Sequence, residues 1–265
     1  MKNLKKMPVT YTIIILCVIN FLIINFWPKN ITTTSMAIVC GAYYKAFVSA
    51  GEVWRLLTVG LVHIDVFHLA INMFSLYTLG SLLERYYGSL RYGIILAICT
   101  ISGSLTSYIF DGNTVLVGIS GGLYGLMATE IMMIIKSGAL QNKGIRSSLI
   151  STILINIMIN FIPGIGVYAH LGGFLMGILL SFSFKVYAID KKLQRKYAIC
   201  TILLLVLLIG FSFTKREIKE DEMYLGTDIE VLQYEKDHGL GWYANNLCDR
   251  LESLYDIYGI QFYLN

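Results

Sequence analysis

Ser120 and His170 are the two residues of this sequence whose types and surroundings best suit nucleophilic catalysis. Ser120 stands in the small-residue run 118–125 (GISGGLYG), and His170 stands in the run 168–173 (YAHLGG). A serine hydroxyl is a weak nucleophile until a neighbouring base accepts its proton, and an imidazole can be that base. If two helices bring these runs together, the pair predicts attack by Ser120 with His170 as its base.

Small residues provide a way to bring the two side chains together. Ala169, Gly173 and Gly177 recur every four residues, the spacing of a helix face that lets another helix approach closely. The serine segment has a similar set, Gly118, Gly122 and Gly125. Taken alone, the glycines indicate only helix packing, and a lone histidine in an apolar helix is more often structural. The hydrolase elbow GxSxG also matches 118–122, but that elbow follows a strand of a soluble sheet, which these apolar flanks exclude.

His68 and Asn72 form a second polar group in an apolar stretch, within the run 63–73 (HIDVFHLAINM). Residues four apart lie on one face of a helix, so the two side chains present hydrogen-bond donors together. One interpretation is an oxyanion hole, which stabilises the negative charge of a tetrahedral intermediate. The other is a hydrogen bond that joins neighbouring helices.

The composition indicates a membrane protein. Hydrophobic residues make up 56% of the 265 residues and charged residues only 14%, against roughly 25% charged in soluble domains. The mean hydropathy is +0.65. Charges separate apolar runs that are about long enough to cross ~30 Å of hydrocarbon at ~1.5 Å per residue, and the turn signal at 163–166 (PGIG) divides the longest run. The sequence predicts an all-α polytopic membrane protein with spans near 8–27, 66–86, 92–110, 119–136, 147–161, 168–187 and 197–214.

The charge distribution predicts the orientation. Residues 1–214 contain 16 Lys and Arg against 6 Asp and Glu, whereas residues 215–265 contain 5 against 11. With a cytoplasmic N-terminus, thirteen Lys and Arg fall in inner loops and three in outer loops before the tail, as the positive-inside rule requires. We therefore expect a membrane domain over 1–214 and an acidic, non-cytoplasmic tail over 215–265. The basic residues form no continuous stripe, so nucleic acid is not an expected partner.

Two further polar features have structural interpretations. The connection 28–62 is rich in aromatic residues and predicts an element at the membrane interface, with Trp54 and Arg55 as anchors. Glu130 lies ten residues after Ser120, about 15 Å deeper along a helix, and Lys136 is its expected partner.

The five cysteines show no CxxC pair and no regular spacing, so we expect neither a disulfide framework nor a zinc site, and no cofactor. A pairing of Cys40 with Cys248 on the outer side stays open.

Taken together and in order, these motifs resemble the rhomboid family of intramembrane serine proteases. The resemblance covers about 51–177. It rests on Trp54-Arg55, on the HxxxxHxxxN run of His63, His68 and Asn72, on Glu84, on GxSG at Ser120 with Tyr124 one turn later, and on AHxxGxxxG at His170, Gly173 and Gly177.

The resemblance implies a six-helix core, here with a seventh C-terminal helix, and an endopeptidase that cuts membrane proteins in or next to their transmembrane segments. It implies Ser120 as nucleophile, His170 as base, Tyr124 packed on His170, and an oxyanion hole from His68, Asn72 and the backbone at Gly118. Its expected partners are the lipid bilayer and membrane-protein substrates with one transmembrane helix. The expected location is a bacterial-type cell membrane.

The sequence lacks the catalytic residues of two other classes of membrane protease. A metalloprotease needs HExxH, which is absent from the sequence, and an aspartyl enzyme needs two aspartates at membrane depth, whereas Asp65, Asp111 and Asp190 lie at span ends. The remaining alternative is a catalytically inactive rhomboid-like protein that binds membrane clients.

Overall fold

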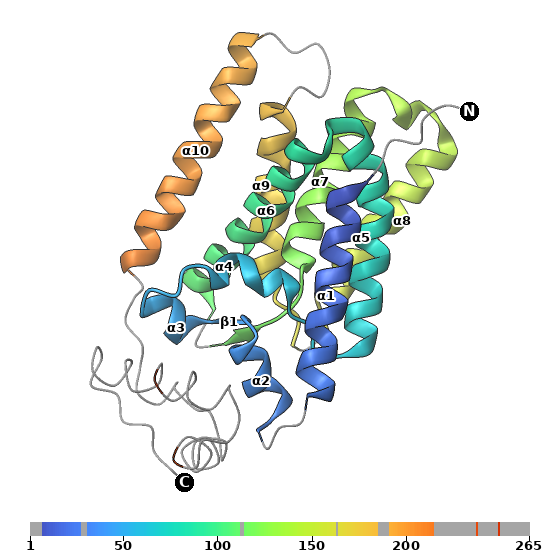
Figure 1. Cartoon of the computed structure of the whole chain (residues 1–265). Helices are drawn as coiled ribbons and strands as arrows, with labels where there is room; N and C mark the ends of the chain where they lie inside the picture. Colours follow the sequence, from blue (N-terminus) through green and yellow to red (C-terminus); the bar gives the residue numbers. More distant parts are fainter. Residues whose placement is uncertain are drawn as a thin grey trace. The chain divides into compact units, whose positions relative to one another are not determined.

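The computed structural model describes residues 7–27, 31–111, 114–162, 164–184 and 191–214, together with Asp237 and Asp249. Almost all of the predicted tail lies outside the described residues, and so does Cys248, the second member of the candidate Cys40–Cys248 pair. Over the described ranges the chain is helical apart from one two-stranded sheet (Figure 1). The α-helices are α1 (Pro8–Phe26), α2 (Thr33–Val39), α3 (Lys45–Ser49), α4 (Arg55–Thr58), α5 (Val66–Tyr87), α6 (Ser89–Phe110), α7 (Ser120–Lys136), α8 (Lys143–Ile159), α9 (Val167–Ser183) and α10 (Lys191–Thr214).

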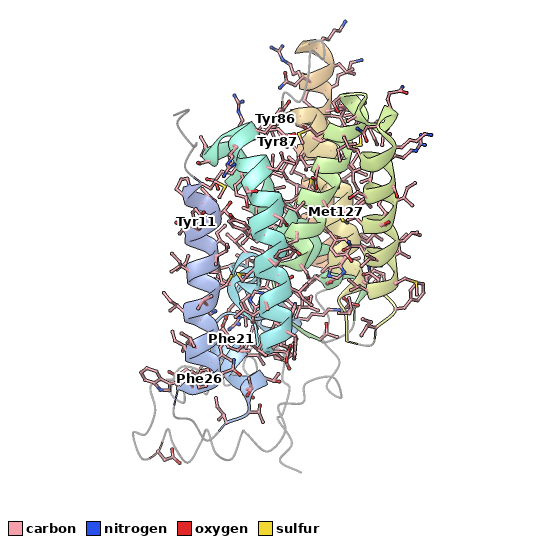
Figure 2. The ribbon with its side chains drawn as sticks, turned by 90° about the vertical axis from the view of Figure 1, so that its right-hand side faces the viewer. Tyr11, Phe21, Phe26, Tyr86, Tyr87 and Met127 are labelled. Carbon is pink, nitrogen blue, oxygen red and sulfur yellow. The ribbon has the colours of Figure 1, made fainter. Side chains whose placement is uncertain are left out.

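Four of the described helices are long and apolar enough to cross a membrane, over Pro8–Phe26, Val66–Tyr87, Ser89–Phe110 and Lys192–Ser212. The helix α9 is apolar but shorter. The exposed side chains of the four long helices are largely apolar. Examples are Phe26 on α1, Phe74 on α5 and Leu207 on α10, which are 73%, 70% and 67% exposed. Figure 2 shows Tyr11, Phe21 and Phe26 along α1. The chain is therefore an all-α, multi-pass membrane protein.

The observed helices differ from the predicted spans at the start of α8 and at the end of α9. The helix α8 begins at Lys143, before the charge-free run, because the side chain of Asn142 accepts hydrogen bonds from the backbone N–H groups of Gly144 and Ile145. Such a cap satisfies N–H groups that lack partners at a helix start. The helix α9 ends at Ser183, and the last residues of the predicted span 168–187 lie outside the described part of the chain.

The chain divides into two units. The first comprises residues 1–11, 74–110 and 120–212, and the second comprises 12–73, 111–119 and 213–265.

In the first unit, α6, α7 and α9 pack side by side (Figure 1). Glycines permit this packing. A Cβ on Gly173 of α9 would overlap the carbonyl oxygen of Gly121 on α7, and a Cβ on Gly177 would overlap that of Gly125. Gly122 faces α6 instead, where a Cβ would meet Leu96 and Thr100. The face of α7 that contacts α9 is thus formed by Gly121 and Gly125, which lie four residues apart, as close helix packing requires.

Glu84 on α5 holds the start of α1 in the same unit. Its carboxylate accepts hydrogen bonds from the backbone N–H groups of Val9 and Thr10, at 3.0 and 2.9 Å, and from the Thr10 hydroxyl at 2.7 Å. The first N–H groups of a helix have no partner within the helix, and a negative charge is favourable there. The carboxylate therefore acts as a cap supplied by another helix.

The predicted ion pair of Glu130 with Lys136 is wrong. The Lys136 ammonium lies 3.5 Å from the ring centroid of Phe182 and has no hydrogen-bonding partner among the described residues. Six residues correspond to about 240° around a helix, so the two side chains point in different directions. Lys136 instead makes a cation–π contact with Phe182, whose ring stacks on that of Tyr197 on α10.

In the second unit, Arg55 organises the connection between α1 and α5, and its predicted role as an interface anchor is wrong. The side chain is fully buried, while Trp54 beside it is 52% exposed. Arg55 donates hydrogen bonds to the carbonyl oxygens of Ile38 and Ala42, at 2.7 and 2.6 Å, and pairs with Glu52 at 2.7 Å. The physical reason is that one of these carbonyl groups lies in the last turn of α2 and the other just after it, where helix carbonyls turn outward, and the guanidinium has several donors.

The same unit contains the short sheet. Its strands β1 (Tyr43–Tyr44) and β2 (Val115–Leu116) pair antiparallel, with Tyr43 opposite Leu116. The sheet ties the connection that follows α2 to the segment that leads into α7.

Candidate active site

Ser120 and His170 are in direct contact. Ser120 is the first residue of α7 and His170 lies in the first turn of α9. The Ser120 Oγ and the His170 Nε2 are 2.8 Å apart, and His170 is only 6% exposed. This separation lies within the range expected of a serine nucleophile and its base.

The backbone packing of α7 against α9 explains this contact. A Cβ on Gly121 would stand 3.2 Å from the carbonyl oxygen of Ala169, one residue before His170. One turn deeper, Gly173 lies against Gly121. Because Ser120 and His170 neighbour these close approaches, the helix register places the hydroxyl beside the imidazole.

Tyr124 lies on the His170 ring. The two ring centroids are 4.0 Å apart and the planes differ by 10°. Tyr124 is one turn after Ser120 on α7, so the same helix supplies the hydroxyl and a flat surface that limits rotation of the imidazole. The Tyr124 hydroxyl donates to the carbonyl oxygen of Asn156 at 3.0 Å.

Asn160, the residue that follows α8, was not anticipated from the sequence. Its Oδ1 is 2.7 Å from His170 Nδ1, the ring nitrogen that faces away from Ser120. A signal was present, since Asn156 and Asn160 are two amides spaced like neighbours on one helix face within an apolar run, and polar groups at membrane depth are functional candidates. Asn160 pairs with a residue of the next helix, His170, and no periodic pattern in the sequence predicts that pairing.

The second unit contains the other three predicted site residues. A Cβ on Gly118 would stand 2.7 Å from His68 Nε2 and 3.2 Å from Asn72 Nδ2, and Gly118 has φ +104°, a conformation that favours glycine. These three residues are therefore in contact. The Gly118 N–H donates to the carbonyl oxygen of Val59 at 3.1 Å.

His63 holds the amide of Asn72. Asn72 Nδ2 is 3.0 Å from His63 Nε2, and the rings of His63 and His68 are 5.1 Å apart. His63 precedes α5. Burial, with a smaller contribution from the charge of His68, lowers the pKa of His63 to about 3. The neutral ring accepts one of the two N–H groups of Asn72, and the other is not used in this bond.

Among the described residues, no group of three His, Cys, Asp or Glu is arranged to hold a metal ion.

Comparisons with known proteins give the family. Residues 50–187 match the Rhomboid domain. RHOMBOID-like protein 1 of Arabidopsis thaliana is 36% identical over 137 residues, covering 51% of this chain and 35% of that protein. Rhomboid protease GluP of Bacillus subtilis is 29% identical over 208 residues, covering 77% and 40%. Inactive RHOMBOID-like protein 8 of Arabidopsis thaliana is 35% identical over 137 residues, covering 51% and 39%.

A multi-pass helical membrane protein with a serine–histidine contact is the class that the fold and site define. The chain belongs to the rhomboid family, which confirms the resemblance drawn from its motifs. It spans less than half the length of these curated relatives, and the relatives include both a named protease and a named inactive protein.

Proposed function

We propose that the chain is an intramembrane serine endopeptidase in which Ser120 and His170 form the catalytic dyad. The observation that carries the proposal is the 2.8 Å contact between Ser120 Oγ and His170 Nε2. A structural histidine would need only some hydrogen-bonding partner. Here the partner is a serine at a helix start, and the ring is also held by Tyr124.

The proposed reaction follows from the atoms in contact. Ser120 Oγ attacks the scissile carbonyl carbon while His170 Nε2 accepts the hydroxyl proton. The imidazolium then gives that proton to the leaving amine as the C–N bond breaks, which leaves an ester on Ser120. Water attacks the ester, His170 takes a proton from the water and returns it to Ser120, and the new carboxyl end departs.

Donors for the oxyanion are proposed from two sources. The backbone N–H groups at the start of α7, those of Ser120 and Gly121, lie where a helix leaves such groups without internal partners. The side chains of His68 and Asn72 are the second source, and Gly118, two residues before Ser120 in the chain, leaves them room because it has no Cβ. Loss of one such donor typically lowers kcat by ~10²–10³.

The membrane arrangement is part of the proposal. Seven spans, corresponding to α1, α5, α6, α7, α8, α9 and α10, form a six-helix core with a seventh helix after it, and residues 1–214 form the membrane domain. The charge asymmetry supports a cytoplasmic N-terminus and an acidic outer tail over 215–265. Ser120 and His170, each at the start of its helix, then lie toward the outer side, where water can enter.

The proposed substrates are membrane proteins with one transmembrane helix that unwinds locally and has a small residue before the cut. A peptide bond inside a regular helix is shielded by neighbouring side chains and is held in backbone hydrogen bonds, so local unwinding is required before Ser120 can reach its carbonyl.

Cleavage of a reporter in liposomes tests the proposal. The reporter carries one transmembrane helix with a Gly-Ala pair near its outer end. We expect cleavage by the wild-type chain, none by Ser120→Ala or His170→Ala, and normal cleavage by Ser137→Ala, whose exposed hydroxyl bonds only backbone groups of Ile134 and Ala139 after the far end of α7. Equal cleavage by Ser120→Ala would overturn the proposal. Binding of the reporter without cleavage by the wild type would favour an inactive, client-binding protein.

A further inference from the structure

We infer that Asn160 is a positioning residue that converts the proposed dyad into a Ser120–His170–Asn160 relay with a neutral third member. The inference rests on the proposed function and adds a residue that the motifs do not include. Asn160 is joined to the site by three hydrogen bonds of its side-chain amide, to His170, Tyr124 and Asn156.

The partners of the amide determine which way it points. A side-chain amide can be turned over without changing its shape, so its partners must decide. Asn160 Nδ2 is 2.7 Å from the carbonyl oxygen of Asn156, and a carbonyl oxygen accepts but never donates. The nitrogen must therefore face that oxygen. The Asn160 Oδ1 is left to face His170 Nδ1, at 2.7 Å.

The position of Asn156 in its helix makes its carbonyl available. Asn156 is in the last turn of α8, which ends at Ile159, and the last four carbonyl groups of a helix lack N–H partners within it. Two side-chain donors use this oxygen, Asn160 Nδ2 and the Tyr124 hydroxyl. Because the Tyr124 hydroxyl uses its proton in the bond to Asn156, its oxygen can only accept in the second contact, from Asn160 Nδ2 at 2.9 Å.

The orientation of the amide sets the tautomer of His170. Because Oδ1 of Asn160 is an acceptor, the proton of the neutral ring is placed on Nδ1. Nε2 then carries the lone pair, and it is Nε2 that lies 2.8 Å from Ser120 Oγ. The ring is thus prepared to accept the serine proton. In soluble serine proteases an asparagine in the third position lowers kcat about 10⁴-fold because the wrong tautomer results; here Asn156 and Tyr124 hold the amide in the productive direction.

A neutral residue suits this location. A carboxylate would stabilise the imidazolium more strongly, but an ionised group at membrane depth has a large desolvation cost. The oxygen of an amide supplies an acceptor for Nδ1–H without that charge. Asn160 thereby orients His170 and partly stabilises the positive charge that forms on it during the reaction.

Kinetics of purified variants on the liposome reporter test the inference. For Asn160→Ala we expect kcat to fall about 10- to 100-fold with KM nearly unchanged, because a hydrogen bond to a charged group is lost. Asn25→Ala is the matched control, since the Asn25 amide makes the same kind of bond to a carbonyl four residues earlier, that of Phe21, but lies on α1 outside the proposed site. It should retain wild-type kcat.

The pH profile separates positioning from simple structural support. The groups that face the His170 ring include Ser120 and Tyr124 from α7 and Asn160 from the end of α8. In Asn160→Asp a carboxylate replaces the neutral amide and favours the charged ring, so the acidic limb of kcat/KM should move to higher pH. An unchanged limb, together with kcat within twofold of wild type for Asn160→Ala, would overturn the inference.

A spectroscopic measurement on the wild-type protein does not depend on its activity. The sequence has four histidines, so wild-type protein labelled with ¹⁵N-histidine gives few ring signals, and His170→Gln identifies the one of interest. We expect His170 protonated on Nδ1 above its pKa. A ring protonated on Nε2 would contradict the inference.

The activity assays distinguish failure of the proposed function from failure of the inference. If Ser120→Ala cleaves normally, the proposed function fails. If Ser120→Ala is inactive but Asn160→Ala has wild-type kinetics, only the inference fails.

Discussion

Gly173 lies against the carbonyl oxygen of Gly121 with no room for a Cβ between the two helices. This contact joins α9 to α7 at the turn that carries Ser120 and His170. Helix packing of this kind depends on small residues that let backbones approach. The site is therefore positioned by backbone contact between two helices, and its tolerance to substitution should follow from that contact.

Substituting Gly173 tests the helix contact. In Gly173→Ala the added Cβ meets backbone atoms of Gly121 that cannot move aside, so we expect α7 and α9 to separate. Such overpacking typically costs about 1–3 kcal/mol, and reporter cleavage should fall with the thermal midpoint in detergent. Gly210→Ala on α10 is the matched control, since its Cβ meets nothing within 4 Å. Equal midpoints for the two variants would contradict the packing account.

Arg55 should contribute to stability and not to membrane attachment. Arg55→Ala leaves the carbonyl groups of Ile38 and Ala42 and the carboxylate of Glu52 without the guanidinium. Breaking a buried pair in this way costs roughly 3–5 kcal/mol, so we expect a lower thermal midpoint. Arg91→Ala, at an exposed arginine, should have little effect. A midpoint unchanged in Arg55→Ala, with altered membrane partition, would restore the role of interface anchor.

Tyr124 combines a ring contact and a hydroxyl contact, which two variants separate. Tyr124→Phe keeps the stacked ring, so kcat should stay within about threefold of wild type, because Asn156 still orients Asn160. Tyr124→Leu removes the stacking, and the loss of an aromatic contact predicts a fall of about 2- to 10-fold in kcat relative to the Phe variant. If leucine supports the same kcat as phenylalanine, the ring does not restrain His170.

His63 should make the fold sensitive to acid. Its pKa falls from 6.5 in the unfolded chain to about 3 in the folded protein, so below pH 6.5 the unfolded state binds a proton that the folded state does not. The contribution of neutral His63 to the free energy of unfolding is therefore fully present above pH 6.5. It is lost as the pH falls toward 3, by up to about 1.4 kcal/mol per pH unit.

The measurement compares wild type with His63→Gln between pH 4.5 and 7.5, by thermal unfolding in detergent. Glutamine retains an acceptor for Asn72 but does not titrate. The wild type should lose more stability than the variant on acidification. Parallel curves would show that His63 is not buried in its neutral form.

The sequence predicted much of the site because helix spacing is a local property. The small residues 169, 173 and 177 indicated a close partner for α9, and the structure provides it through Gly121 and Gly125. Arg55 was misinterpreted because its partners are backbone carbonyls at Ile38 and Ala42, which no sequence pattern displays. Asn160 was missed for a similar reason, since its hydrogen bond to His170 depends on how the turn after α8 directs the chain.

Labelling of the nucleophile tests the central proposal most directly. Purified protein in detergent is treated with a serine-directed phosphonate and digested, and the adduct is located by mass spectrometry. The account predicts one adduct on Ser120, absent from Ser120→Ala, strongly slowed in His170→Ala and unchanged in Ser137→Ala. Labelling that persists in Ser120→Ala at the wild-type rate, or that proceeds normally without the imidazole of His170, would contradict it.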